Sequence, residues 1–361
     1  MMKQILYQSS KLPAMQNVLF SNKEEALKTS HSELCLVMDP SGYVVNSAFN
    51  PDLVEYNCNY QNDQSHSAAF QKHLEDVAQY CKQFLPAHSG VIVDVGCGKG
   101  GFVNVLRSHG LNAIGYDNTY EGSSPFIRRS FFDVHSHETG DLLTLRHVLE
   151  HIQNPWEFIR NLAKANDRKG FLYVEVPDLQ WILKNSAHYD LFHEHVNYFC
   201  LEDFSRCFQG ALRSSTSLFE GQYLGVILDL SLIQSDCPNV ELPLGYVESL
   251  VDSFHSLAQH EESAYMQAKS CERLVIWGAA SKGVIFAAKA PPVVAGKLAY
   301  AIDINPSKAN CYMPLSGLLV VGPRQGLERL KPSDTVVIVN PNYEREVVSC
   351  LPPHHPYFVL R

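Results

Sequence analysis

The segment from Tyr189 to Phe199, YDLFHEHVNYF, has the clearest capacity for acid–base chemistry in the chain. His193 and His195 flank Glu194, and aromatic residues lie on both sides. Imidazole titrates near neutral pH, which makes histidine the most frequent general base in enzymes. In an extended segment the two histidines point to one side and the glutamate to the other. We expect a base here; the alternative is that the histidines only brace a loop.

A second segment, VIVDVGCGKGGF from Val91 to Phe102, predicts a strand, a tight turn and a helix start. Gly96, Gly98 and Gly101 fit the G-x-G-x-x-G pattern of NAD enzymes. Asp94 precedes the first glycine, however, and its charge would repel a pyrophosphate. The same carboxylate would attract the ammonium and sulfonium groups of S-adenosylmethionine (SAM). The turn therefore favours SAM, with a tight turn that binds no ligand as the alternative.

Two further acids follow expected strands. Asp117 ends the run NAIGYD, where a carboxylate binds ribose hydroxyls in SAM and NAD sites alike. Asp133, in SFFDV, follows an expected third strand and would reach an adenine amino group. A helix cap or a turn is the alternative role for Asp133. Together these acids predict a nucleoside-containing cofactor.

Composition limits the classes of function. The 361 residues are 45% hydrophobic and 19% charged, so a large core is expected in two or three domains. The net charge of −9 disfavours nucleic acid as a partner. No C-x-x-C pair occurs, and the start lacks an apolar stretch of signal-peptide length. We expect a cytoplasmic protein, a monomer or weak homodimer without a membrane partner.

Three regions must position these residues. Residues 1–80 begin without a regular pattern, become helical near Ser67, and form the expected N-terminal lid over the substrate. Residues 81–235 alternate strand and helix patterns, which predicts a doubly wound parallel sheet that binds the cofactor. Residues 236–361 contain a long helical stretch, about Leu244 to Lys269, and then a second strand–glycine turn–helix unit. This last region predicts a small Rossmann-like α/β domain.

Several motifs together resemble known enzymes. D-V-G-C-G-K-G, G-Y-D and H-V-L-E-H-I-Q-N-P-W resemble class I SAM-dependent methyltransferases. E-V-P-D, followed by F-H-E-H and Y-F, resembles the sugar C-methyltransferases, which methylate a carbon beside a ketone of nucleotide-linked deoxysugars. Segments near both ends, including LPAMQNVLF, WGAASKG and VNPNYEREV, extend the similarity over nearly the whole chain. The resemblance implies a class I methyltransferase fold plus a C-terminal Rossmann-like domain.

The resemblance also implies roles for individual residues. His195 is the base that takes the C–H proton, Glu194 orients the sugar or the imidazole, and His151 lies near the sugar ring. Tyr60, with Tyr56 as the second choice, closes over the sugar. Lys282, at an expected helix start, is an anion partner or a solvated surface lysine. The implied cofactor ligands are Asp94, Gly96, Gly98, Asp117, Asp133 and His147, and the implied substrate contacts are Tyr56, Phe192, His193, Tyr198 and Lys282.

Two departures from the family pattern matter. Met38 and Ser41 stand where related proteins carry a C-x-x-C-G pair for an N-terminal zinc ion, so we predict no metal. Phe192 replaces a tyrosine that some members carry just before H-E-H, so a hydroxyl role at this position is lost or has moved.

Rival functions remain open at this point. His147 to His151 match the H-x-x-E-H pattern of zinc hydrolases, but the run is expected to straddle a strand end, where the histidines diverge. An NAD-linked oxidoreductase fits the glycine pattern. An N- or O-methyltransferase of another small molecule, or a SAM-binding protein without turnover, fits the same fold.

Overall fold

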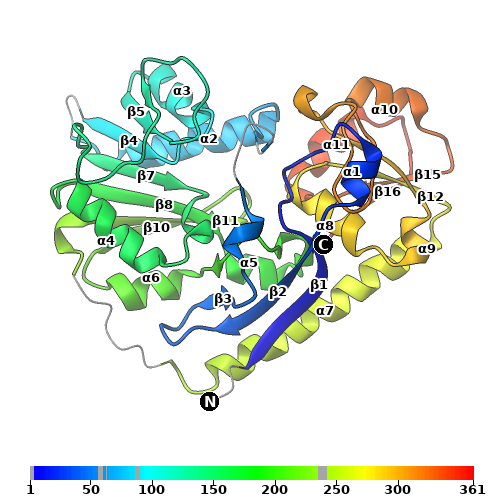
Figure 1. Cartoon of the computed structure of the whole chain (residues 1–361), viewed down its shortest axis with the longest axis horizontal. Helices are drawn as coiled ribbons and strands as arrows, with labels where there is room; N and C mark the ends of the chain where they lie inside the picture. Colours follow the sequence, from blue (N-terminus) through cyan, green and yellow to red (C-terminus); the bar gives the residue numbers. More distant parts are fainter. Residues whose placement is uncertain (1–3, 56–59, 62, 87–89, 235–241) are drawn as a thin grey trace.

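The computed structural model describes residues 4–55, 60–61, 63–86, 90–234 and 242–361. Three sheets organise this part of the chain. Figure 1 shows a seven-stranded sheet and a five-stranded sheet side by side, with an antiparallel sheet built mainly from N-terminal strands between and below them.

The seven-stranded sheet has the strand order β10-β11-β8-β7-β4-β5-β6. Six of its strands run in one direction, and only β11, which pairs with β8 and β10, runs antiparallel to them. The doubly wound sheet predicted for this region, and the class I methyltransferase fold implied by the motifs, are confirmed. The bounds are β4 Val91–Val95, β5 Asn112–Tyr116, β6 Ile127–Arg128, β7 Leu142–Arg146, β8 Phe171–Pro177, β10 Leu212–Leu218 and β11 Tyr223–Asp229.

Helices cover both faces of this sheet because side chains alternate along each strand. Ile92 of β4 packs in one cluster with α2 (Ala68–Lys82) and α3 (Gly101–Ser108). The next residue, Val93, packs in a second cluster with α4 (Pro155–Ala165) and α6 (Leu201–Phe208). The sheet is therefore buried on both faces, and its carboxyl edge is left for a ligand. The predicted boundary at residue 80 falls inside α2.

The N-terminal region is more regular than its sequence suggests. Strands β1 (Ile5–Pro13), β2 (His31–Met38) and β3 (Val44–Asn46) form an antiparallel sheet that β9 (Asn197–Tyr198) completes. The expectation of an irregular start was wrong. Register shifts in β1 break the two-residue alternation by which a strand is recognised. The short helix α1 (Lys23–Leu27) lies between β1 and β2.

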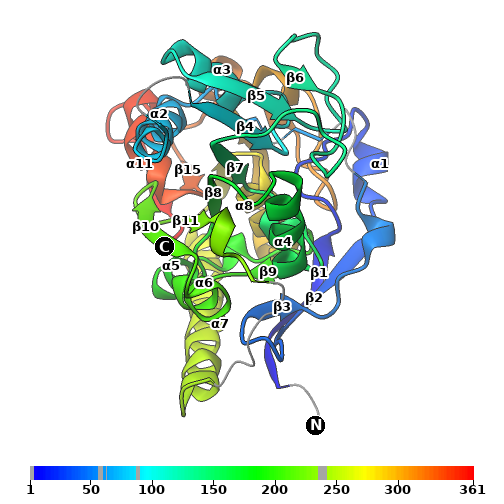
Figure 2. The ribbon, with the colours of Figure 1, turned by 90° about the vertical axis from the view of Figure 1, so that its left-hand side faces the viewer.

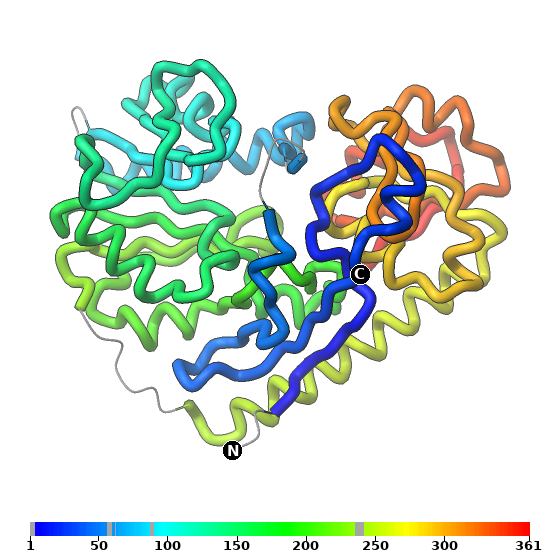
Figure 3. Tube along the Cα trace, viewed as in Figure 1, coloured from blue at the N-terminus to red at the C-terminus, as the bar shows by residue number. Residues whose placement is uncertain are grey.

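The C-terminal unit is an all-parallel sheet with the order β14-β13-β12-β15-β16, as predicted for a Rossmann-like unit. The long helix α7 (Tyr246–Ser270) leads into it and packs along β1 (Figure 3). Its strands are β12 Arg273–Trp277, β13 Leu298–Ile302, β14 Val320–Val321, β15 Asp334–Ile338 and β16 Tyr357–Val359. Its helices are α8 Ser281–Lys289, α9 Pro292–Ala295, α10 Pro323–Arg329 and α11 Glu344–Cys350.

The N-terminal region joins the two α/β units. β3 pairs with β9 of the methyltransferase-like unit, while Phe20 forms a β-bridge with Tyr312 of the C-terminal unit. Helix α5 (Leu179–Lys184), which follows β8, also contacts α7, and Figure 2 shows these two helices close together. Among the described residues, no helix is long and apolar enough to cross a membrane.

Candidate active site

A cavity of about 530 Å³ lies between the two α/β units. Its walls come from the turns after β4 and β7 on one side and after β12, β13 and β15 on the other. These are carboxyl ends of parallel strands, the usual place for a ligand in an open α/β sheet. Of the predicted site residues, the cavity is lined by Tyr60, Asp94, Gly96, Gly98, His147, His151, Phe192, His195 and Lys282.

The glycine turn opens into this cavity. Gly98 has φ +54°, and a Cβ added to it would meet no atom within 4 Å. Gly96 has φ +72° and lies so close to Val148 that a Cβ would come within 2.6 Å of its methyl group. Both positions need glycine because of their backbone conformation, and only Gly98 leaves open space beside the cavity. The turn can therefore hold a ligand against its backbone.

Asp94 is buried beside this turn, near the end of β4. The hydroxyl of Thr144 donates a hydrogen bond of 2.7 Å to Oδ1 of Asp94. Burial raises the pKa of Asp94 to about 6; this hydrogen bond and the charge of Arg146 oppose the rise. The carboxylate is thus charged at neutral pH but poorly solvated, which favours a cationic ligand group next to it.

The two acids predicted to bind the nucleoside do not line the cavity. Asp117 supports the turn, because Oδ2 accepts a hydrogen bond of 2.9 Å from the backbone N–H of Gly98. Asp133 is exposed, and its carboxylate accepts from the backbone N–H of His135 at 2.8 Å. A strand does precede Asp133, but β6 ends at Arg128, so Asp133 stands in a turn five residues beyond the last strand residue. Asp133 thus has the turn contact considered as its alternative.

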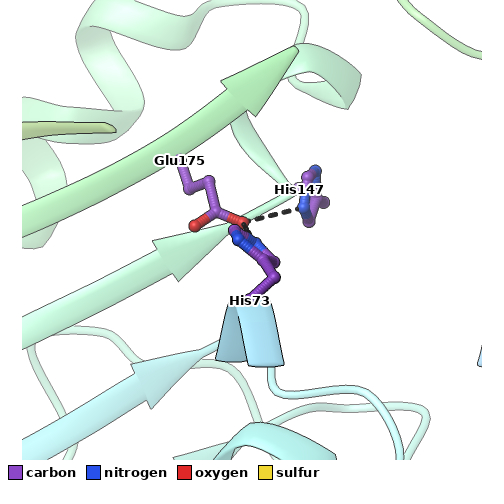
Figure 4. A group of neighbouring side chains, drawn as sticks. All are labelled: His73, His147 and Glu175. Atoms are coloured by element: carbon purple, nitrogen blue, oxygen red, sulfur yellow. Dashed lines mark hydrogen bonds and ion pairs between the residues drawn. The ribbon is translucent and has the colours of Figure 1, made fainter. Parts of the chain in front are cut away.

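A buried carboxylate, Glu175, lies behind the cavity wall and contacts His147 and His73 (Figure 4). Its Oε1 lies 3.0 Å from Nε2 of both His73 and His147 and 2.8 Å from Nη2 of Arg146. The hydroxyl of Tyr173 donates to Oε2 at 2.6 Å. Burial opposes the negative charge, yet the neighbouring Arg146 and histidines hold the pKa of Glu175 well below its usual range.

His147 carries a positive charge because it lies between two acids. Burial acts to lower its pKa, but Glu150 and Glu175 raise it to about 9. Nδ1 of His147 lies 3.6 Å from Oε1 of Glu150, and the backbone N–H of His147 donates to the Glu175 carbonyl at 2.9 Å. The backbone of His147 has φ +53°, an uncommon value for a residue other than glycine. The site holds this imidazolium in one position.

The H-E-H segment forms a turn, and its two histidines diverge. The expectation that they point to the same side was wrong, because a turn removes the alternation of an extended strand. His193 is buried outside the cavity, with Nδ1 2.7 Å from the Glu33 carbonyl. His195 lines the cavity. His193 therefore holds the N-terminal sheet in place, and its contact with a substrate stays a prediction.

Glu194 is tied to the N-terminal region. Its Oε2 accepts a hydrogen bond of 2.9 Å from the Tyr60 hydroxyl, and its Oε1 accepts one of 2.8 Å from the backbone N–H of Gln16. Glu194 is not among the cavity-lining residues, whereas Tyr60 is. The alternative to Tyr60, Tyr56, lies outside the described residues. Glu194 thus positions Tyr60 at the cavity wall.

His151 and His195 form a pair across the cavity wall. Their ring centroids are 4.9 Å apart, and Nδ1 of His151 lies 3.0 Å from the Glu194 carbonyl. The centroids of the Phe192 and His195 rings are 4.0 Å apart. Burial lowers the pKa of His195 well below its usual value, and His151, His147 and Lys282 lower it further. His195 is therefore a neutral imidazole, the form that accepts a proton.

Two other predicted substrate contacts are buried. Lys282 is only 8% exposed and pairs with Asp190, so it is not a solvated surface lysine. Burial lowers the pKa of Lys282, and Asp190 opposes this shift. Tyr198 lies outside the cavity, and its hydroxyl bonds the backbone of Phe192. Tyr198 thereby supports the H-E-H turn from behind.

Sequence reasoning missed the charged residues around the histidines. Glu150 and Asp190 line the cavity, as does Arg146. Glu150 lies inside the H-V-L-E-H motif and was considered only as part of a zinc pattern. Glu175 and His73 come together only through the packing of α2 on β8, which no local motif reveals.

Two clusters contain the ligand types of a metal site. One consists of His73, His147 and Glu175, and the other of Glu150, His151 and His195. The first already holds the Arg146 guanidinium against Glu175, so a second cation there would be repelled. The two histidines of the H-x-x-E-H run fall in different clusters, as predicted for a run that straddles a strand end. The absence of a metal stays a prediction.

Comparisons with known proteins agree with this fold. Residues 68–211 match the family model of a methyltransferase domain, which confirms the prediction of such a domain. The C-methyltransferase NovU of Streptomyces niveus is 24% identical over 152 residues, covering 38% of this chain. The matched region spans only 36% of the length of NovU, about a third of that relative.

Solved structures give distant matches. The SAH-bound form of CalO1, a methyltransferase in calicheamicin biosynthesis, is 19% identical with a TM-score of 0.34, covering 44% of this chain and 52% of CalO1. The SAM-bound magnesium protoporphyrin IX methyltransferase ChlM of Synechocystis PCC 6803 is 16% identical with a TM-score of 0.32, covering 44% of this chain and 78% of ChlM.

Proposed function

We propose that the protein is a SAM-dependent C-methyltransferase that acts on the carbon beside a ketone of a nucleotide-linked deoxysugar. One observation carries the proposal: a single cavity joins the glycine turn and Asp94 to the His151–His195 pair and to the carboxyl edge of the C-terminal sheet. A cofactor site, a candidate base and room for a second ligand therefore adjoin one another. The C-methyltransferase name of NovU supports the choice of carbon as the methyl acceptor.

The residues around the glycine turn fit SAM. Asp94 offers a buried carboxylate to a cationic group, and Gly98 lets a ligand approach the backbone. His147, positively charged between its two acids, suits a ligand carboxylate. When bound, SAM supplies an electrophilic methyl group for the nucleophilic carbon of the sugar.

The proposed proton transfer uses His195. The neutral imidazole takes the proton from the carbon beside the ketone, and the electron pair of that C–H bond moves onto the carbonyl oxygen. Phe192 and the buried surroundings exclude water from the ring of His195, which protects the resulting enolate from reprotonation. His151, held by the Glu194 carbonyl, orients the sugar beside it.

The remaining parts of the chain bind the rest of the substrate in this proposal. Residues 1–80 serve as a lid through Tyr60, residues 81–235 hold SAM, and residues 236–361 hold the nucleotide portion. The N-terminus of α8 lines the cavity and has no side-chain cap, so its backbone N–H groups are available to a phosphate. We propose a small-molecule substrate and a monomer or weak homodimer acting in the cytoplasm.

The test combines binding and turnover. Calorimetry with SAM and with NAD identifies the cofactor, and a panel of nucleotide-linked ketosugars is then assayed for release of S-adenosylhomocysteine. New carbon–methyl bonds, located by NMR, support the proposal. Binding of NAD in place of SAM would refute it. Methylation at nitrogen or oxygen, or SAM binding without turnover on any ketosugar, would replace C-methylation by one of the alternative functions.

A further inference from the structure

The surroundings of His195 are electrostatically unfavourable for a base. His151 of the H-V-L-E-H run, His147 after β7 and Lys282 of α8 all act against a positive charge on this ring. Phe192 and Tyr198 add aromatic surface without charge. A base that takes a proton here gains its charge in a buried site among cationic groups. Some carboxylate must compensate that charge, and the sequence motifs do not say which.

Most nearby carboxylates are already committed to other partners. Asp190 pairs with Lys282 through Oδ1, while its Oδ2 has no hydrogen-bond partner among the described residues, and both oxygens of Glu194 accept hydrogen bonds from the N-terminal region. Glu175 is surrounded by Arg146, Tyr173 and two histidines. The negative charges of these acids already interact with other cations or hydrogen-bond donors, so they are less available to stabilise a charge on His195.

Glu150 differs from these acids because it lies in one group with the ring nitrogens of His151 and His195. It is only 1% exposed and lines the cavity, and its Oε2 has no hydrogen-bond partner among the described residues. Nδ1 of His195 is also buried without a partner. One carboxylate oxygen of Glu150, one ring nitrogen of His151 and one of His195 lie within 4.8 Å of one another. Buried polar atoms without a hydrogen-bond partner are rare in folded proteins. Here the carboxylate of Glu150 and the ring of His195 both have such an atom, and the two side chains belong to the same group.

We propose that Glu150 is the counter-ion of His195: its free carboxylate oxygen stabilises the imidazolium that forms when His195 accepts the substrate proton. This inference rests on the proposed function, because it assumes that His195 is the base. Glu150 acts through His195 and is therefore a positioning residue. His147 neutralises part of the Glu150 charge through Oε1, which leaves Oε2 without a hydrogen-bond partner among the described residues.

The test isolates proton removal from methyl transfer. The full-length protein, with S-adenosylhomocysteine in place of SAM, is mixed with a ketosugar in D₂O, and NMR follows replacement of the acidic C–H hydrogen by deuterium. Glu150→Gln keeps the size of the side chain and removes its charge. We expect the exchange rate of this variant at the pH plateau to fall about tenfold, the equivalent of one unit in the pKa of His195. The acid limb of the pH profile should lie at the same or a lower pH, because loss of the counter-ion cannot raise the pKa of His195.

Matched variants separate charge from structure. Glu150→Asp keeps the charge and should restore part of the rate, whereas Glu157→Gln removes an exposed carboxylate of α4 and should leave the rate unchanged. In a His195→Gln background, Glu150→Gln should have no further effect, because the two residues act as one unit. Thermal melting checks that each variant folds.

The outcomes distinguish the two proposals. If His195→Gln retains normal exchange, the assignment of the base is wrong. If His195→Gln is inactive but Glu150→Gln exchanges within about twofold of wild type, or shifts the acid limb to higher pH, the counter-ion role of Glu150 is refuted.

Discussion

The imidazolium of His147 should make the stability of the protein fall in alkaline solution. Its pKa is raised to about 9 in the folded state, whereas an unfolded histidine titrates near 6.5. A group with a raised folded pKa contributes its full stability below the unfolded pKa and loses it as the pH rises through the folded pKa. The stabilising contribution of His147 should therefore be complete below about pH 6.5 and absent above about pH 9.

The magnitude follows from the size of the shift. A difference of about 2.5 pKa units corresponds to about 3.4 kcal/mol, since one unit is about 1.4 kcal/mol. The His147 side chain is 27% exposed, so solvent screens part of its interaction with Glu175 and Glu150. We expect a loss of about 2 kcal/mol in the free energy of unfolding between pH 6.5 and pH 9.5.

Urea unfolding of wild type and His147→Gln, followed by circular dichroism at several pH values, measures this contribution. The variant should be less stable at pH 6.5 and should approach wild type at pH 9.5. Parallel pH profiles for the two proteins would refute the reasoning, because His147 would then carry no titrating charge in this range. Glu157→Gln, with its exposed carboxylate, serves as the control for a general effect of charge.

Three further predictions concern the cavity. His195→Ala should keep its affinity for SAM in calorimetry but lose about 100-fold or more in turnover, the usual scale for a general base; near-normal turnover would exclude that role. SAM affinity should fall as the pH drops below about 6, where Asp94 takes up a proton, and Asp94→Asn should bind weakly at every pH; an unchanged pH profile in the variant would argue against this contact. Treatment with a chelator should leave turnover intact, and a loss that zinc restores would overturn the prediction of a metal-free site.

The methyltransferase core was predictable because its signals are local. The strand, turn and helix around Gly96 and Gly98 follow one another in the chain, and glycine is required where φ is positive. Parallel strands buried on both faces also give continuous apolar runs, which are easy to recognise. The N-terminal strands lack this signal, because register shifts in β1 interrupt its alternation.

The candidate site was only partly predictable. Tyr60, His151 and His195, selected by resemblance rather than by spacing, line one cavity, and their catalytic roles stay predictions. The resemblance implied a substrate contact for His193, and alternation was expected to place it on the same side as His195, but the segment folds as a turn and His193 contacts Glu33. The backbone N–H of His195 donates to the Phe192 carbonyl at 3.3 Å within this turn, a contact that an extended strand would not make.

The sequence by itself therefore determined the doubly wound core, the glycine turn and the types of residue available for proton transfer. The tertiary structure alone decided which charges meet. Glu175 gathers His73, Arg146 and His147 from separate elements, and Glu150 comes within 4.8 Å of a ring nitrogen of His195. Electrostatic interaction depends on distance and burial, and neither is encoded in local spacing, so the charge balance of the site appears only when distant segments pack together.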